Sequence, residues 1–223
     1  MASVNEQIVR AYLESVGFLV RQPRKYQVMS RSKGLHEEVD FLAFNPLADE
    51  KGKRPSDLLW GGRELSRIRF AVVTVRGWHS EKFTAAMLAS SPDVYRFAEP
   101  ESIRSAEAEL GMPEPAKILC MADLPVSSDQ REEALEFLKS RGIDGVLLFR
   151  TMLLELADRV DVKKSYEKSD LLQVLRILKN YDLLQSGQMN LFAPFRRRRA
   201  SSPSPSDTSL ELPLPSREDD PLP

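Results

Sequence analysis

Two polar residues interrupt an otherwise apolar stretch of the chain, residues 69–78 (RFAVVTVRGW). Its β-branched residues predict a strand that ends at Gly77. Because side chains alternate across a strand, Thr74 and Arg76 share one face. Asp40, in a second apolar stretch, is a carboxylate that needs a partner or a function if it is buried. We expect Asp40, Thr74 and Arg76 to converge on one side of neighbouring strands, where they can pair with one another or bind a metal or a phosphate.

Other polar and aromatic residues could extend such a site. Glu6 lies in the first turn of a predicted helix, where its carboxylate either suits the helix dipole or serves the site. We expect Arg76 to lie within salt-bridge reach of Asp40 or Glu6. Trp78 either packs against the core or stacks on a nucleobase, as His79 also could. The candidates for binding nucleic acid are Arg24, Lys25, Arg31, Lys33, Arg76, Trp78, His79 and Lys82.

These residues need a scaffold, and the periodicity of the sequence predicts one. Helices are expected at 4–16, 81–90, 99–110, 129–140, 151–160 and 169–181, and strands at 18–20, 39–44, 69–78, 117–122 and 145–150. Residues 129–132 resemble a capping box. Trp60, before two glycines in a polar insertion at 47–68, suggests a turn that the tryptophan ring pins to the surface. The order of elements predicts an α/β fold with a mixed sheet flanked by helices.

Composition limits the kind of protein. The chain has 223 residues, 42% hydrophobic and 29% charged residues, and a net charge of −1. This is typical of a globular protein, and the net charge favours no particular partner. The single cysteine, Cys120, excludes an internal disulfide framework, lies in a predicted buried strand, and fits a reducing, cytoplasmic setting. We expect no signal peptide and no membrane span.

The chain divides into a predicted α/β domain at 1–192, with closing C-terminal helices, and a tail at 193–223. The tail is rich in Arg, Ser and Pro, and we expect it to be disordered because it can bury little apolar surface. Its Arg196–Arg199 run is either solvated or binds a polyanion. The helix at 169–181 has an unusually wide apolar face, so it either packs deeply or meets a protein partner.

The order of these motifs over roughly residues 4–150 resembles the PD-(D/E)xK nuclease superfamily, which has the restriction-endonuclease-like fold. That family places a glutamate on its first helix, an aspartate on its second strand, and an acid-x-lysine pair on a valine-rich third strand. Glu6 and Asp40 match the first two positions. Thr74 and Arg76 occupy the acid and lysine positions. The resemblance implies DNA as the partner and Mg²⁺ as the cofactor of an active member.

The departures from the family pattern argue against cleavage. Thr74 is neutral and a poor ligand for a hard cation, which leaves Asp40 as a weak metal candidate. Arg76 cannot accept a proton near neutral pH because the pKa of a guanidinium exceeds about 12.

Four interpretations follow from these residues. Asp40 and Arg76 can be a buried ion pair left by a lost active site. The chain can be a degenerate, non-cleaving nuclease-like protein with a nucleic-acid-binding or assembly role, and this is the leading hypothesis. It can instead be a Mg²⁺-dependent DNA endonuclease with a rearranged site. Finally, it can be a protein-interaction module that uses the helix at 169–181.

Overall fold

The computed structural model describes residues 3–23, 39–49, 54–79, 82–111 and 114–184. Its strands are β1 (Leu19–Arg21), β2 (Phe41–Phe44), β3 (Phe70–Arg76), β4 (Ala116–Met121) and β5 (Gly145–Leu148). Its α-helices are α1 (Val4–Ser15), α2 (Gly62–Leu65), α3 (Ala85–Ser90), α4 (Pro100–Leu110), α5 (Ser128–Ser140), α6 (Phe149–Arg159) and α7 (Asp170–Asn180). Two 3₁₀ turns, η2 (Pro92–Val94) and η3 (Arg96–Ala98), lie between α3 and α4.

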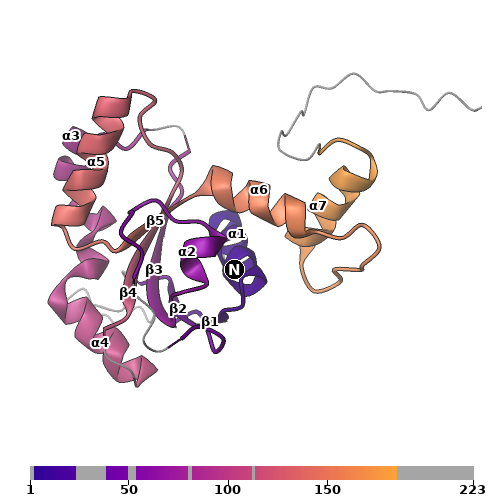
Figure 1. Cartoon of the computed structure of the whole chain (residues 1–223), viewed down its shortest axis with the longest axis horizontal. Helices are drawn as coiled ribbons and strands as arrows, with labels where there is room; N and C mark the ends of the chain where they lie inside the picture. Colours follow the sequence, from indigo (N-terminus) through magenta and orange to yellow (C-terminus); the bar gives the residue numbers. More distant parts are fainter. Residues whose placement is uncertain (1–2, 24–38, 50–53, 80–81, 112–113, 185–223) are drawn as a thin grey trace, which may run out of the picture. The chain divides into compact units, whose positions relative to one another are not determined.

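The five strands form one mixed sheet in the order β1-β2-β3-β4-β5. β1 and β2 are antiparallel, as are β2 and β3, whereas β3, β4 and β5 run parallel. Helices fill the long connections that parallel strands require, and they cover both faces of the sheet (Figure 1). The predicted α/β fold with a helix-flanked mixed sheet is therefore confirmed for the described residues.

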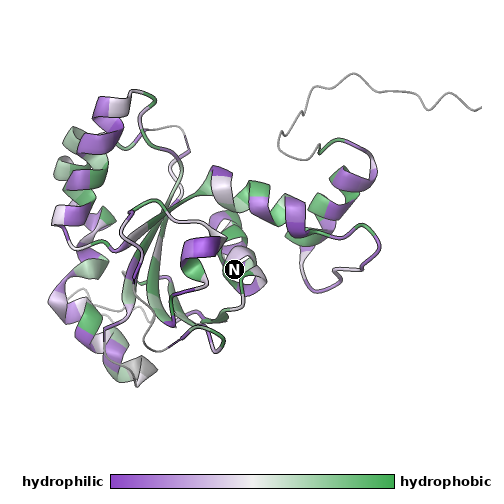
Figure 2. Cartoon of the chain, viewed as in Figure 1, coloured by the Kyte–Doolittle hydropathy of each residue, from purple (hydrophilic) through white to green (hydrophobic). Residues whose placement is uncertain are grey.

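The alternation of β3 divides the core into two clusters. Ala71 and Val73 pack on the side that holds α1 and α6. Val72 packs on the other side, with residues of α3 and α5. In Figure 2 the strands are mostly hydrophobic, whereas the helices carry hydrophilic and hydrophobic residues side by side along their length. The sheet thus supplies the apolar centre, and each helix contributes one apolar face.

Two local predictions are wrong. The predicted strand at 145–150 ends at Leu148, because Leu148 pairs with the last residue of β4, Met121, and Phe149 begins α6 instead. The capping box predicted at 129–132 does not form. Helix α5 begins at Ser128, and its N-cap residue is Ser127, whose side chain makes no capping hydrogen bond.

The Trp60 ring is only 3% exposed, which agrees with the prediction that it pins a turn to the surface of the domain. Its ring packs on Gly145, where an added Cβ would lie 2.3 Å from the indole. Trp60 N donates to Val146 O at 2.9 Å, and Val146 N donates to Leu58 O at 2.7 Å. This part of the insertion therefore covers the outer edge of β5, which leaves that edge less open to pairing with another chain.

Helix α7 begins as expected, with Ser169 accepting a hydrogen bond from Leu172 N. Leu175 is its buried residue, and the helix packs against α1 and α6. Val174, Ile177 and Tyr181 are 52%, 44% and 64% exposed. The wide apolar face is therefore split between core packing and solvent. In the part of the chain that the structure describes, no helix has both the length and the apolar character needed to cross a membrane.

The predicted domain boundary at 192 and the disordered tail at 193–223 lie outside the described residues.

Candidate functional site

The candidate site lies where β2 begins and β3 ends. Phe41 of β2 is opposite Val73 of β3, so Asp40 is next to Thr74 across the strand pair. Alternation along β3 places Thr74 and Arg76 on the face of Val72, toward α3 and α5. Arg76 pairs with Met121 at the end of β4, and Met121 pairs with Leu148 at the end of β5. We call the ends of β3, β4 and β5 the carboxyl edge of the sheet.

Asp40 is bound to the backbone of β3 at two points. Its amide donates to Val73 O at 3.0 Å, and its Oδ2 accepts from Val75 N at 2.7 Å. Asp40 is only 4% exposed. Because a buried amide without an acceptor is costly, this carboxylate stabilises the point at which β2 begins.

Arg76 links Asp40 to the helical layer. Its Nη1 lies 3.7 Å from Asp40 Oδ2, which confirms the expected salt-bridge reach. Nη1 also donates to Val75 O at 3.0 Å, and Nη2 donates to Asp93 O, in η2, at 2.7 Å. The Arg76 side chain is 18% exposed and that of Asp40 is 6% exposed. The guanidinium is therefore committed to internal acceptors, and its charge offsets that of Asp40.

Thr74 is fully buried beside this pair. The acid position of the family pattern thus holds a neutral hydroxyl, and the neighbouring guanidinium would repel a cation. Among the described residues, no group of three or more His, Cys, Asp or Glu side chains could hold a metal ion. Mg²⁺ prefers carboxylate oxygens that are free to coordinate, so the residues of this site do not fit it.

Glu6 acts as a capping residue of α1. Its Oε2 accepts from Ser3 N at 3.3 Å and from Gln22 Nε2 at 2.9 Å, while its own amide donates to Ser3 Oγ at 3.2 Å. This is a reciprocal capping box. The carboxylate that the resemblance assigns to catalysis is therefore explained by the start of the helix.

Beyond Arg76, a second group of residues lies at the carboxyl edge. Asn5 Nδ2 donates to Gly77 O at 3.4 Å, and Asn5 Oδ1 lies 2.9 Å from Nε2 of His79. A Cβ at residue 77 would lie 1.8 Å from Asn5 Nδ2, so only glycine permits this approach. The His79 ring meets Phe149 edge-on, with centroids 5.0 Å apart. Sequence reasoning missed Asn5, for which a glycine at the end of the strand was the only signal.

The remaining candidates for binding nucleic acid have different surroundings. Trp78 is 42% exposed and stacks on the buried Phe83, with centroids 5.7 Å apart and planes inclined by 10°. Lys82 Nζ lies 3.7 Å from Asp123 Oδ2, in a pair whose side chains are about half exposed. The other basic candidates, Arg24, Lys25, Arg31 and Lys33, lie outside the described residues.

Cys120 is a core residue, as expected. It lies in β4 and is fully buried. Burial raises the pKa of its thiol, and the negative charge of Asp40 raises this pKa further. The thiol therefore stays protonated and unreactive at neutral pH.

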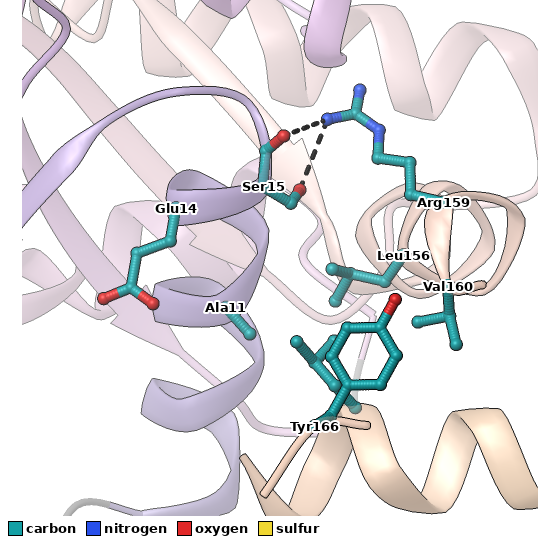
Figure 3. A pocket seen from close by; sticks show the side chains of 8 residues that line it. Ala11, Glu14, Ser15, Leu156, Arg159, Val160 and Tyr166 are labelled. Atoms are coloured by element: carbon teal, nitrogen blue, oxygen red, sulfur yellow. Dashed lines mark hydrogen bonds between the residues drawn. The ribbon is translucent and has the colours of Figure 1, made fainter. Parts of the chain in front are cut away.

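A cavity of about 420 Å³ opens on the opposite side of the sheet from Thr74, between α1 and α6 (Figure 3). Arg159 Nη1 reaches across it to Ser15, whose carbonyl and hydroxyl oxygens accept at 2.9 and 3.3 Å. The carboxylate of Glu14 points away from Arg159 and Tyr166. We therefore regard the cavity as a feature of helix packing, separate from the candidate site.

Comparisons with known proteins found no family model, no curated protein and no solved structure that matches this chain.

Proposed function

We propose that this chain is a degenerate nuclease-like protein of the restriction-endonuclease-like fold, which binds nucleic acid at the carboxyl edge without cleaving it. The order of elements supports the fold, since a helix and three strands precede helices and further strands. Asp40 and the Thr74–Arg76 pair also lie side by side on neighbouring strands, as the family pattern requires.

The observation that carries the non-cleaving assignment is the state of Asp40. Its Oδ2 is bonded to Val75 N and paired with Arg76. An active site of this class needs carboxylates that hold a cation and a base that activates water. Here one carboxylate is already neutralised, and Arg76, at the lysine position, has no accessible neutral form.

Binding is proposed for the rim of the site rather than its centre. Trp78 and His79 are exposed and follow Arg76 along the chain, after Gly77. Exposed aromatic rings are groups on which nucleic-acid-binding surfaces stack bases.

Fluorescence anisotropy with labelled DNA and RNA oligonucleotides tests this proposal. We expect binding that weakens as the salt concentration rises, because phosphate contacts release counterions. The absence of binding at low salt to any single-stranded or duplex DNA or RNA would remove the proposal.

A second candidate, a protein-interaction module, is favoured by one observation. Val174, Ile177 and Tyr181 form an exposed apolar row on α7 at helical spacing. Light scattering of the wild type and an Ile177→Asp variant tests for self-association through this row. A wild type that is monomeric at all concentrations would leave only a different protein as the partner.

A further inference from the structure

The two exposed rings at the carboxyl edge are each supported by a buried phenylalanine. Trp78 stacks on Phe83, with the ring centroids 5.7 Å apart and the planes inclined by 10°. Phe83 itself is fully buried, in the cluster on the α3–α5 side. Trp78 is nevertheless 42% exposed, so this contact leaves a large part of the residue accessible.

His79 has an equivalent support on the other side of the sheet. Its ring contacts Phe149, which is 2% exposed and belongs to the cluster on the α1–α6 side. Asn5 holds the Nε2 atom at 2.9 Å. Because Asn5 Nδ2 donates to Gly77 O, the amide oxygen faces His79, and Nε2 must be the donor. Asn5 is therefore a positioning residue for an exposed imidazole.

We infer that the carboxyl edge binds unpaired nucleobases, which stack on Trp78 and beside His79, so that its ligand is single-stranded nucleic acid. This inference rests on the proposed function and specifies its ligand. A ring that already stacks on a buried phenylalanine has little freedom left to lose, so a base that stacks on its exposed part costs little conformational entropy. In a duplex the base faces are occupied by neighbouring bases and cannot reach such a ring.

The charged side chains near Trp78 and His79 are consistent with a ligand that binds partly by stacking rather than by phosphate contacts alone. The guanidinium of Arg76 is committed to Asp40 and to carbonyl oxygens, and Lys82 is paired with Asp123. Since Arg76 already bonds to acceptors inside the protein and Lys82 lies in an exposed pair with Asp123, the exposed rings of Trp78 and His79 are the groups that we propose contact the ligand.

Intrinsic fluorescence gives a direct readout because the chain has only two tryptophans. Trp60 is 3% exposed and Trp78 is 42% exposed. Titration of the full chain with oligo(dT) and with a mixed-sequence duplex should quench Trp78 with the single strand only. In a Trp60→Phe variant the quenching should persist.

Four variants separate stacking from packing. Trp78→Tyr keeps a ring that can stack, whereas Trp78→Leu covers Phe83 with an apolar side chain but cannot stack. Asn5→Ala releases His79, and Tyr181→Ala removes an exposed ring on α7 as the matched control. We expect anisotropy to show a loss of about tenfold or more in single-strand affinity for Trp78→Leu, smaller losses for Trp78→Tyr and Asn5→Ala, and wild-type affinity for Tyr181→Ala.

The outcomes separate this inference from the proposed function. Equal or tighter binding of duplex, with Trp78→Leu unchanged, would overturn the single-strand inference and leave nucleic-acid binding intact. The absence of binding to any nucleic acid would overturn both. A several-fold preference for single strands that Trp78→Leu removes would establish the inference.

Discussion

Two neighbouring regions, one within the sheet and one just after β3, use their polar and aromatic groups differently. Within the sheet, Asp40, Thr74 and Arg76 are buried or nearly so, and the carboxylate and the guanidinium bond to each other and to the backbone. Just after β3, Trp78 and His79 are exposed but contact buried rings. A few residues of chain therefore separate a buried ion pair from the exposed rings at which we propose that nucleic acid binds.

The largest expected effect comes from breaking the buried pair with Asp40→Ala. This change leaves Arg76 without its partner and Val75 N without its acceptor. We expect a loss of roughly 3–5 kcal/mol in the free energy of unfolding, measured by urea denaturation. The control is Asp40→Asn, which keeps an acceptor for Val75 N and should lose less. Unchanged or increased stability of Asp40→Ala would mean that the carboxylate is a strained functional group rather than a structural one.

The double variant Thr74→Glu, Arg76→Lys restores the family pattern and tests why the site formed by Asp40, Thr74 and Arg76 does not fit a metal. Without Mg²⁺ the second buried carboxylate should lower the melting temperature by several degrees, because two like charges then lie side by side. Mg²⁺ at millimolar concentration should recover part of this loss in the variant and leave the wild type unchanged. Equal stabilisation of both proteins by Mg²⁺ would contradict the account of the site.

Alkaline conditions should weaken the core cluster on the α1–α6 side, which contains Cys120 and Tyr12. Burial raises the pKa of Cys120, and the pKa of Tyr12 is raised by burial and by Glu155. Both groups ionise more readily in the unfolded chain than in the folded one. The free energy of unfolding should therefore be unaffected by these groups below about pH 8.5 and should decline above it. Urea midpoints at pH 7, 9 and 10 measure the decline, and Cys120→Ala should make it shallower. A midpoint that rises with pH would show the opposite sign.

The smallest expected effect concerns the end of β3. In Gly77→Ala the new Cβ would displace Asn5 and release His79, while the buried pair stays intact. We expect a loss of a few fold in single-strand affinity, measured by anisotropy. Gly111→Ala, at a glycine with open space around it but a φ of 69°, is the control for backbone strain, and it should affect stability rather than affinity. Equal losses of affinity in both variants would argue against a specific role for Asn5.

Sequence patterns were sufficient for the centre of the fold and insufficient for its margins. The alternation at 69–78 placed Thr74 and Arg76 on one face, and the apolar run at 39–44 brought Asp40 beside them. The end of β5 was missed because it depends on where β4 ends, which is a long-range property.

Other contacts could be found only in the structure, because they too join residues that are distant in sequence. Trp60 is buried because Gly145, distant in sequence, leaves room for its ring. Asn5 reaches His79 across 74 positions of the chain, and no local pattern encodes that contact. Glu6 fitted two interpretations until its bonds to Ser3 and Gln22 placed it at the start of α1.

The claim that the Asp40–Arg76 pair is structural is tested most directly by a plasmid cleavage assay with Mg²⁺ and with Mn²⁺. Wild type and Asp40→Asn should both leave supercoiled DNA at the background level, because Asp40 is paired with Arg76 and a guanidinium cannot serve as the base that activates water. Metal-dependent nicking by the wild type that Asp40→Asn abolishes would contradict the account and establish a rearranged Mg²⁺-dependent nuclease instead.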